Sequence, residues 1–146
     1  MRRIEAVTDI DAPAERVWAI LTDFDAFPQW NPFVKSITGD LRPGERLIVR
    51  LQPPGGRGMT FKPEVLEATP PRVLRWLGQL GIKGIFDGEH AFEIEPLAAG
   101  RCRFIHSETF RGILIPVFGG MLSKTAEGFR EMNEALKRRA EANPVV

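Results

Sequence analysis

Apolar and polar residues alternate over short runs through most of the chain between residues 33 and 111, which is the pattern of strands that bury one face. Glycine and proline interrupt these runs at Pro43-Gly44, Pro53-Pro54-Gly55-Gly56, Pro70-Pro71 and Gly100, where turns are expected. With an N-terminal strand at Arg3–Ile10, the predicted strands are Phe33–Thr38, Glu45–Gln52, Met59–Ala68, Arg72–Gly78, Gly84–Glu95 and Arg101–Arg111. The pattern therefore predicts seven strands in an antiparallel meander.

Three segments change from the period of a strand to that of a helix. A helix is expected from Pro13 to about Asp23, because proline suits the first helical position and the apolar residues that follow form a stripe. The proline-rich, aromatic segment Phe24–Pro32 predicts one short helix that packs inward. Residues Met121–Ala142 predict a long amphipathic helix, followed by a frayed end at residues 143–146. The fold class is therefore α+β, with the whole chain, residues 1–146, as one domain.

Composition and charge exclude several classes of function. The 20 basic and 19 acidic residues leave almost no net charge, so a nucleic-acid partner is not expected. No apolar run approaches the roughly 20 residues of a transmembrane helix, and no secretion signal stands at the N-terminus, so we expect a cytoplasmic protein. One cysteine and two histidines are too few for a structural zinc site, and no phosphate-binding glycine motif is present. We therefore expect neither a metal nor a cofactor.

The first third of the chain carries a family resemblance. Ile10-Asp11-Ala12-Pro13, then Val17 to Asp23, then Phe27-Pro28-Gln29-Trp30-Asn31-Pro32 resemble the START-related SRPBCC superfamily, and the likeness extends over essentially the entire chain. The resemblance implies a helix-grip fold, in which a curved antiparallel sheet wraps a long C-terminal helix, with two short helices between the first two strands. It also implies a ligand cavity between sheet and helix, as in lipid-transfer and polyketide cyclase/dehydrase-like members. It implies no single activity.

Two histidines and a carboxylate lie on the inward faces of the last two predicted strands. His90 alternates with phenylalanine and isoleucine on one strand, and His106 and Glu108 do so on the next. A regular hairpin would place His90 opposite His106, with Glu108 diagonally adjacent. The three side chains are therefore predicted to form one polar cluster on an apolar wall.

Three interpretations of this cluster remain open. The side chains satisfy one another's hydrogen bonds within the cavity wall, or they orient a ligand, or they catalyse proton transfer or hold a metal. A pocket can shift the pKa values of carboxyl and imidazole groups towards pH 7, which favours the catalytic interpretation. The absence of a third histidine weakens the metal interpretation.

Strand parity and helix spacing predict the remaining pocket wall. The expected ligand-binding residues are Leu47, Val49, Leu51, Val65, Trp76, His90, Phe92, Phe104, His106, Glu108, Phe110, Phe129, Met132 and Asn133. The mouth is expected near Gly112–Gly120, because the prolines and glycines there make the approach to the last helix deformable.

The sequence therefore favours a protein that binds a small hydrophobic molecule, such as a lipid, an isoprenoid or an aromatic polyketide-like compound. The first alternative is a polyketide cyclase/dehydrase-type enzyme that uses His90, His106 or Glu108 to move a proton in the same cavity. The second alternative is a protein-interaction module. A homo-oligomer is compatible with each of the three.

Overall fold

The computed structural model describes residues 1–79 and 82–142, and within them eight strands and a long C-terminal helix. The strands are β1 Arg2–Ile10, β2 Val34–Thr38, β3 Ile48–Leu51, β4 Met59–Phe61, β5 Glu64–Thr69, β6 Val73–Gln79, β7 Asp87–Pro96 and β8 Cys102–Arg111. The helices are α1 Ala14–Thr22, the 3₁₀ turn η1 Phe24–Ala26, α2 Phe27–Trp30, the 3₁₀ turn η2 Ile115–Phe118 and α3 Gly119–Glu141. The expected frayed end lies outside the described residues.

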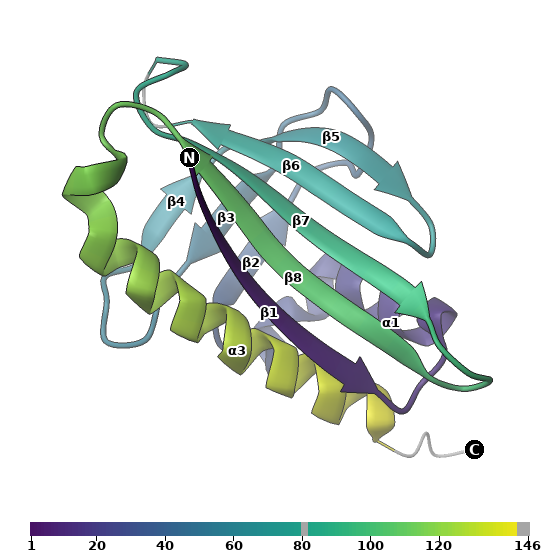
Figure 1. The fold of residues 1–146 in the computed structure, drawn as a ribbon. Helices are drawn as coiled ribbons and strands as arrows, with labels where there is room; N and C mark the ends of the chain where they lie inside the picture. The colour runs from purple at the N-terminus through teal and green to yellow at the C-terminus, as the bar shows by residue number, and fades with distance from the viewer. Residues whose placement is uncertain (80–81, 143–146) are drawn as a thin grey trace.

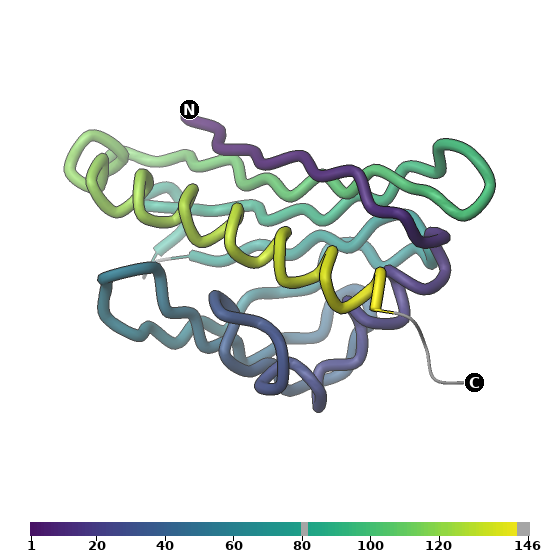
Figure 2. Tube along the Cα trace, turned by 90° about the horizontal axis from the view of Figure 1, so that it is seen from below, coloured from purple at the N-terminus to yellow at the C-terminus, as the bar shows by residue number. Residues whose placement is uncertain are grey.

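The strands form two antiparallel sheets with α3 between them. The larger sheet has the order β1-β8-β7-β6-β5, and the smaller has the order β2-β3-β4. Figure 1 shows α3 crossing one side of the larger sheet, and Figure 2 shows the segment with β2 to β4 on the other side of this helix. This is the helix-grip arrangement, so the predicted fold class is confirmed.

The strand count differs from the prediction because the run Met59–Ala68 is divided at Pro63. Proline has no N–H with which to continue a ladder, so β4 ends at Phe61 and β5 begins at Glu64 in the other sheet. Regular β3 pairing begins only at Ile48, because the residues before it bond to β5: Leu47 N–H donates to Pro63 O, and Val65 N–H donates to Glu45 O. These hydrogen bonds join the two sheets edge to edge.

The central and C-terminal parts of α3 fill the space between the sheets. Phe129, Met132 and Leu136 have no exposed surface. On the same helix, Gly128 faces the ring of Phe33 so closely that a Cβ atom would overlap it. The Phe33 ring in turn packs edge-on against Phe129, with ring centroids 5.7 Å apart. This half of the interior is therefore solid core.

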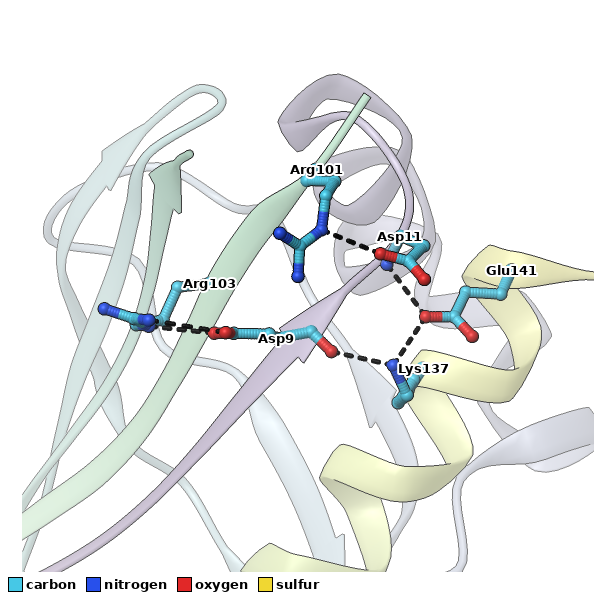
Figure 3. A network of polar contacts seen from close by, with 6 residues as sticks. All are labelled: Asp9, Asp11, Arg101, Arg103, Lys137 and Glu141. Carbon is cyan, nitrogen blue, oxygen red and sulfur yellow. Dashed lines mark hydrogen bonds and ion pairs between the residues drawn. The ribbon is translucent and has the colours of Figure 1, made fainter. Parts of the chain in front are cut away.

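Ion pairs and hydrogen bonds fix the C-terminal end of α3 to the end of β1 (Figure 3). Lys137 Nζ donates to the Asp9 carbonyl at 2.8 Å and to Glu141 Oε2 at 2.6 Å, and the Asp11 N–H donates to the same Glu141 oxygen at 2.8 Å. Arg103 and Arg101 of the β7–β8 hairpin complete the network through Asp9 and Asp11. The helix is therefore anchored at this end of the molecule.

Candidate functional site

A pocket lies at the opposite end, between the two sheets and the first turns of α3. Its apolar wall comes from both sheets and the helix, and its polar groups are few. The lining residues are Val49, Leu51, Pro53, Met59, Phe61, Pro63, Trp76, Gly78, Gln79, Phe86, Gly88, His90, Glu108, Phe110, Met121 and Thr125. An apolar wall with a few converging polar groups is typical of a small-molecule site.

Two glycines that pair across β6 and β7 create part of this space. Gly78 lies opposite Gly88 in the ladder, and both line the pocket. A Cβ atom on Gly78 would have only the Gly88 carbonyl within 4 Å, at 3.9 Å. A Cβ atom on Gly88 would instead overlap the Glu108 carboxyl group. Gly78 therefore leaves open space, whereas Gly88 leaves room for the Glu108 side chain.

The pocket is narrow. Its volume open to the centre of a water-sized sphere is about 70 Å³, whereas drug-sized ligands occupy pockets of roughly 300–1,000 Å³. Two methionines, Met59 and Met121, stand in its wall, and their unbranched thioether side chains adapt readily to different shapes. A ligand larger than a single ring therefore requires these side chains to move.

The structure brings six of the predicted binding residues into this wall, namely Val49, Leu51, Trp76, His90, Glu108 and Phe110. The other predicted residues lie outside the wall, in the packed interior: Leu47, Val65, Phe92, Phe104, His106, Phe129, Met132 and Asn133. On α3, the pocket wall includes Met121 and Thr125, nearer the start of the helix than Phe129, Met132 and Asn133. Large side chains on both the sheet and the helix close the interior there.

The β7–β8 hairpin has a different register from the one predicted. His90 pairs with Glu108, and Phe92 pairs with His106, two residues away from the expected alignment. The reason is the position of the turn, which is centred one residue later than expected: Pro96 pairs with Cys102, Leu97 N–H donates to Arg101 O, and Gly100 adopts a φ of 75°. A shift of two residues preserves the face of every side chain, so the cluster forms even though its pairing was wrong.

The polar cluster is a chain of short contacts that runs inward from the pocket. His90 Nε2 lies 2.6 Å from His106 Nε2, and His106 Nδ1 lies 3.0 Å from Asn133 Oδ1 on α3. His90 Nδ1 faces Glu108 Oε1 at 3.6 Å. The His106 ring also stacks on Phe129, with centroids 3.8 Å apart. Asn133 therefore belongs to the cluster from outside the pocket wall.

The last member of this chain fixes the direction of its hydrogen bonds. Asn133 Nδ2 donates to the Ala6 carbonyl at 3.1 Å, so Asn133 Oδ1 must face His106 and accept from Nδ1–H. The Nε2 atom of a neutral His106 is then an acceptor, and His90 Nε2–H donates to it. The Nδ1 atom of a neutral His90 is consequently left as an acceptor towards Glu108.

Burial keeps all three titratable groups neutral near pH 7. It lowers the pKa of His90 well below its ordinary value, and the adjacent His106 lowers it further. Burial lowers the pKa of His106 to about 3, despite the opposing effect of its hydrogen bond with Asn133. Burial also raises the pKa of Glu108 to about 8. The contact between His90 and Glu108 is therefore a neutral one rather than an ion pair.

Glu108 exposes its carboxyl group to the pocket. Its side chain is 15% exposed, and 3.6 Å is too long for a direct hydrogen bond to His90. Among the described residues it makes no other side-chain hydrogen bond. A protonated Glu108 thus presents an unused O–H donor in an apolar pocket.

Several lining residues were not predicted. Strand alternation places Gly78 and Gly88 on the inward faces of their strands. The space that they leave in the pocket depends on the β6–β7 register, which pairs the two glycines. Met59 and Phe61 lie on β4 of the smaller sheet and Met121 lies in the first turn of α3, so they meet in the pocket wall only in the folded arrangement. Tertiary arrangement rather than local pattern decides these positions.

The described residues also bear on metal binding and on membrane spanning. No group of three or more His, Cys, Asp or Glu side chains within residues 1–79 and 82–142 is placed to hold a metal ion. In the same part of the chain, no helix combines the length and apolar character needed to cross a bilayer.

Comparison with known proteins identifies the family. A sequence model described as "Polyketide cyclase / dehydrase and lipid transport" matches residues 1–141. The chain belongs to this family. No curated protein matches the sequence significantly.

Solved structures of similar fold include members named for this superfamily. A START superfamily protein from Mycobacterium smegmatis is 25% identical, with a TM-score of 0.73 over 95% of this chain and 97% of that one. A protein from Arthrobacter aurescens is 19% identical, with a TM-score of 0.75 over 97% of this chain and 87% of that one. The di-domain ARO/CYC BexL of the BE-7585A biosynthetic pathway is 16% identical, with a TM-score of 0.73. The match covers 98% of this chain but 51% of BexL.

Proposed function

We propose that this member of the polyketide cyclase/dehydrase and lipid transport family binds a small hydrophobic molecule that carries a hydrogen-bond acceptor, such as a ketone. The observation that carries the proposal is the neutral Glu108 carboxyl group in the apolar pocket, whose pKa burial raises to about 8. The apolar wall favours a hydrophobic body, and the protonated carboxyl group favours an acceptor on it.

The neighbouring groups support this role for Glu108. His90 stands behind it as a neutral acceptor and is itself held by His106 and Asn133. The His90 ring packs among three aromatic rings. Its centroid lies 5.2 Å from that of Trp76, 4.6 Å from that of Phe92 and 5.0 Å from that of Phe129. A rigid support of this kind holds the carboxyl group in place before a ligand arrives, which reduces the ordering cost of binding.

A second function is proton transfer to the bound molecule, as a cyclase or dehydrase would require. The observation that favours it is the contact between a neutral acid, Glu108, and a neutral base, His90, at 3.6 Å. In a dehydration, His90 Nδ1 would accept the proton from the carbon beside the hydroxyl-bearing carbon as the double bond forms, and Glu108 would protonate the departing hydroxyl group so that it leaves as water. The proton on His90 would then pass to the Glu108 carboxylate, which restores both groups. BexL bears only on the fold here, at 16% identity.

A matched pair of probes tests the binding function. Acetophenone and ethylbenzene have similar shapes, but only acetophenone has an acceptor. We expect the protein to prefer acetophenone by roughly tenfold, a typical net effect of one hydrogen bond in a dry site. Glu108→Gln retains an N–H donor and should keep the preference, whereas Glu108→Leu should abolish it while ethylbenzene still binds. Equal affinities in all three proteins, measured by calorimetry, would reject the proposed role of Glu108.

The ligand retained by protein isolated from its source separates the two functions. Native mass spectrometry gives its mass before and after incubation with the wild type and with Glu108→Gln. A mass unchanged by both proteins indicates a binder. Loss of one water with the wild type alone indicates a dehydrase, because the amide binds but does not donate a proton to the substrate.

Four further expectations stay predictions. They are one domain over residues 1–146, a cytoplasmic location, the absence of a nucleic-acid partner and a possible homo-oligomer. The family match over residues 1–141 supports the first of them.

A further inference from the structure

Two loops at the pocket end hold apolar side chains out into solvent. Ile82, in the loop after β6, is 76% exposed, and Ile113 and Val117, in the loop after β8, are 73% and 72% exposed. The loops are joined, since Ile113 N–H donates to Gly84 O and Leu114 N–H donates to Ile85 O. Figure 1 shows them side by side near the N-terminus. We call Ile82, Ile113 and Val117 the apolar tip.

The apolar tip stands on a rigid base. Beneath the two loops, Phe86 and Phe118 pack with ring centroids 4.7 Å apart, and Phe86 also packs on Phe110 at 5.5 Å. Phe86, Phe110 and Leu122 form a small core of their own, against which Leu114 and Ile115 are packed. The inward-facing apolar residues of these loops therefore pack on this small core. Within the described residues, the side chains of the apolar tip do not pack on it and remain exposed.

Cations outnumber carboxylates in the segments around the apolar tip. Residues 50–63, 82–87 and 111–124 contain one acidic residue, Asp87, whose carboxylate accepts from the Gly84 N–H at 3.0 Å, although acidic residues make up 19 of the 146 in the chain. They contain six cations, Arg50, Arg57, Lys62, Lys83, Arg111 and Lys124. None of the six forms an ion pair with a carboxylate within the described residues. The opposite end contrasts with this, because Arg101, Arg103 and Lys137 are paired there with Asp11, Asp9 and Glu141 (Figure 3).

Two of these cations lie beside the pocket. A surface groove is lined by Pro53, Gly56, Arg57, Met59, Gly120, Met121 and Lys124. Pro53, Met59 and Met121 also belong to the pocket wall, so the groove adjoins the pocket. Arg57 and Lys124 therefore flank one side of the pocket, and the apolar tip lies on the same end of the molecule.

We propose that this end of the protein docks on an anionic lipid bilayer, with Ile82, Ile113 and Val117 inserted among the acyl chains and the surrounding cations against the headgroups. Apolar side chains protruding from loops, combined with six cations and a single carboxylate, match the two layers of such a surface. An acidic protein would satisfy the cations but offers no general reason for three protruding β-branched side chains. The proposal is independent of the ligand proposed above, because it rests on residues outside the pocket wall.

Vesicle co-sedimentation of the full chain tests the proposal. The wild type should bind vesicles of phosphatidylcholine mixed with phosphatidylglycerol, and bind vesicles of phosphatidylcholine alone at least tenfold more weakly, because several cations contribute roughly fivefold each. Ile113→Asp and Val117→Asp should each reduce binding to the mixed vesicles by about tenfold or more. Both side chains are exposed, so the variants should retain the circular dichroism spectrum of the wild type.

A matched control lies at the other end of the molecule. Leu97, on the β7–β8 turn, is an exposed apolar residue, and Leu97→Asp should bind the mixed vesicles as the wild type does. Gly78→Val, which fills the pocket, should also bind them, so failure of the ligand proposal would leave this one intact. The proposal is overturned if the wild type does not bind the mixed vesicles, or if Ile113→Asp and Val117→Asp bind them as well as the wild type does. It is also overturned if Leu97→Asp or Gly78→Val loses as much binding to the mixed vesicles as Ile113→Asp and Val117→Asp do.

Discussion

At the scale of single residues, the cluster of Glu108, His90, His106 and Asn133 is organised by one backbone carbonyl. The Ala6 oxygen can only accept, so it orients Asn133, and the orientation of each next group follows. Strand parity predicted that the two histidines and the carboxylate share a face. The position of the turn, which sets the register, could not be predicted from residues 96–100, and the role of Asn133 depended on the position of α3.

The stability of the protein should fall between about pH 6.5 and pH 8 because of Glu108. Burial raises the folded-state pKa of this group from its ordinary value of 4.5 to about 8. Its contribution to stability is therefore complete below pH 4.5 and is lost as the pH rises through 8. The two histidines have lowered pKa values, so their contribution grows as the pH rises through 6.5 and then levels off. Of the three groups, only Glu108 therefore loses stability in this window.

Glu108→Gln should remove this dependence. The free energy of unfolding of the wild type should decrease by roughly 1 to 2 kcal/mol between pH 6.5 and 8, since one proton is worth up to about 1.4 kcal/mol per pH unit. Urea denaturation at the two pH values measures it for both proteins. A decrease of equal size in the variant would assign the effect to another group.

At the scale of elements, two glycines on α3 have opposite roles. Alanine is a better helix former than glycine by up to about 1 kcal/mol, so propensity alone favours replacement of both. At Gly120 nothing lies within 4 Å of an added Cβ, whereas at Gly128 the Cβ would overlap the buried ring of Phe33. The helix therefore contacts the segment before β2 through its glycine.

Gly128→Ala should destabilise the protein and Gly120→Ala should stabilise it. Overpacking against Phe33, which is itself held by Phe129, should cost about 1–3 kcal/mol and exceed the gain in helix propensity. Gly120→Ala should gain up to about 1 kcal/mol. Thermal unfolding of the two variants gives the signs, and a stabilised Gly128→Ala would contradict the close packing described here.

The same scale shows where the pattern of residues was sufficient. The helix period predicted α3 to within two residues at its start, and alternation predicted β1, β7 and β8 closely. The division of Met59–Ala68 was missed because alternation continues through Pro63, although the proline itself was the signal that pairing must change there.

At the scale of the whole molecule, one end is packed and anchored and the other contains the pocket. The family resemblance predicted the fold and a cavity between sheet and helix. The position and size of the cavity were not predictable, because they depend on which of the inward side chains touch. Phe129 and Met132 fill the interior between α3 and the sheet, whereas the Gly78–Gly88 pair leaves space for the cavity.

The affinity of ethylbenzene for the wild type and for Gly78→Val, measured by calorimetry, tests the account most directly. Valine suits a strand, and a Cβ atom at position 78 would have only the Gly88 carbonyl within 4 Å, so the melting temperature should not fall. We predict that the wild type binds ethylbenzene and that Gly78→Val binds it at least about tenfold more weakly, because the valine side chain occupies the apolar volume that ethylbenzene would fill. Equal affinity in the two equally stable proteins would contradict the claim that this pocket is the ligand site.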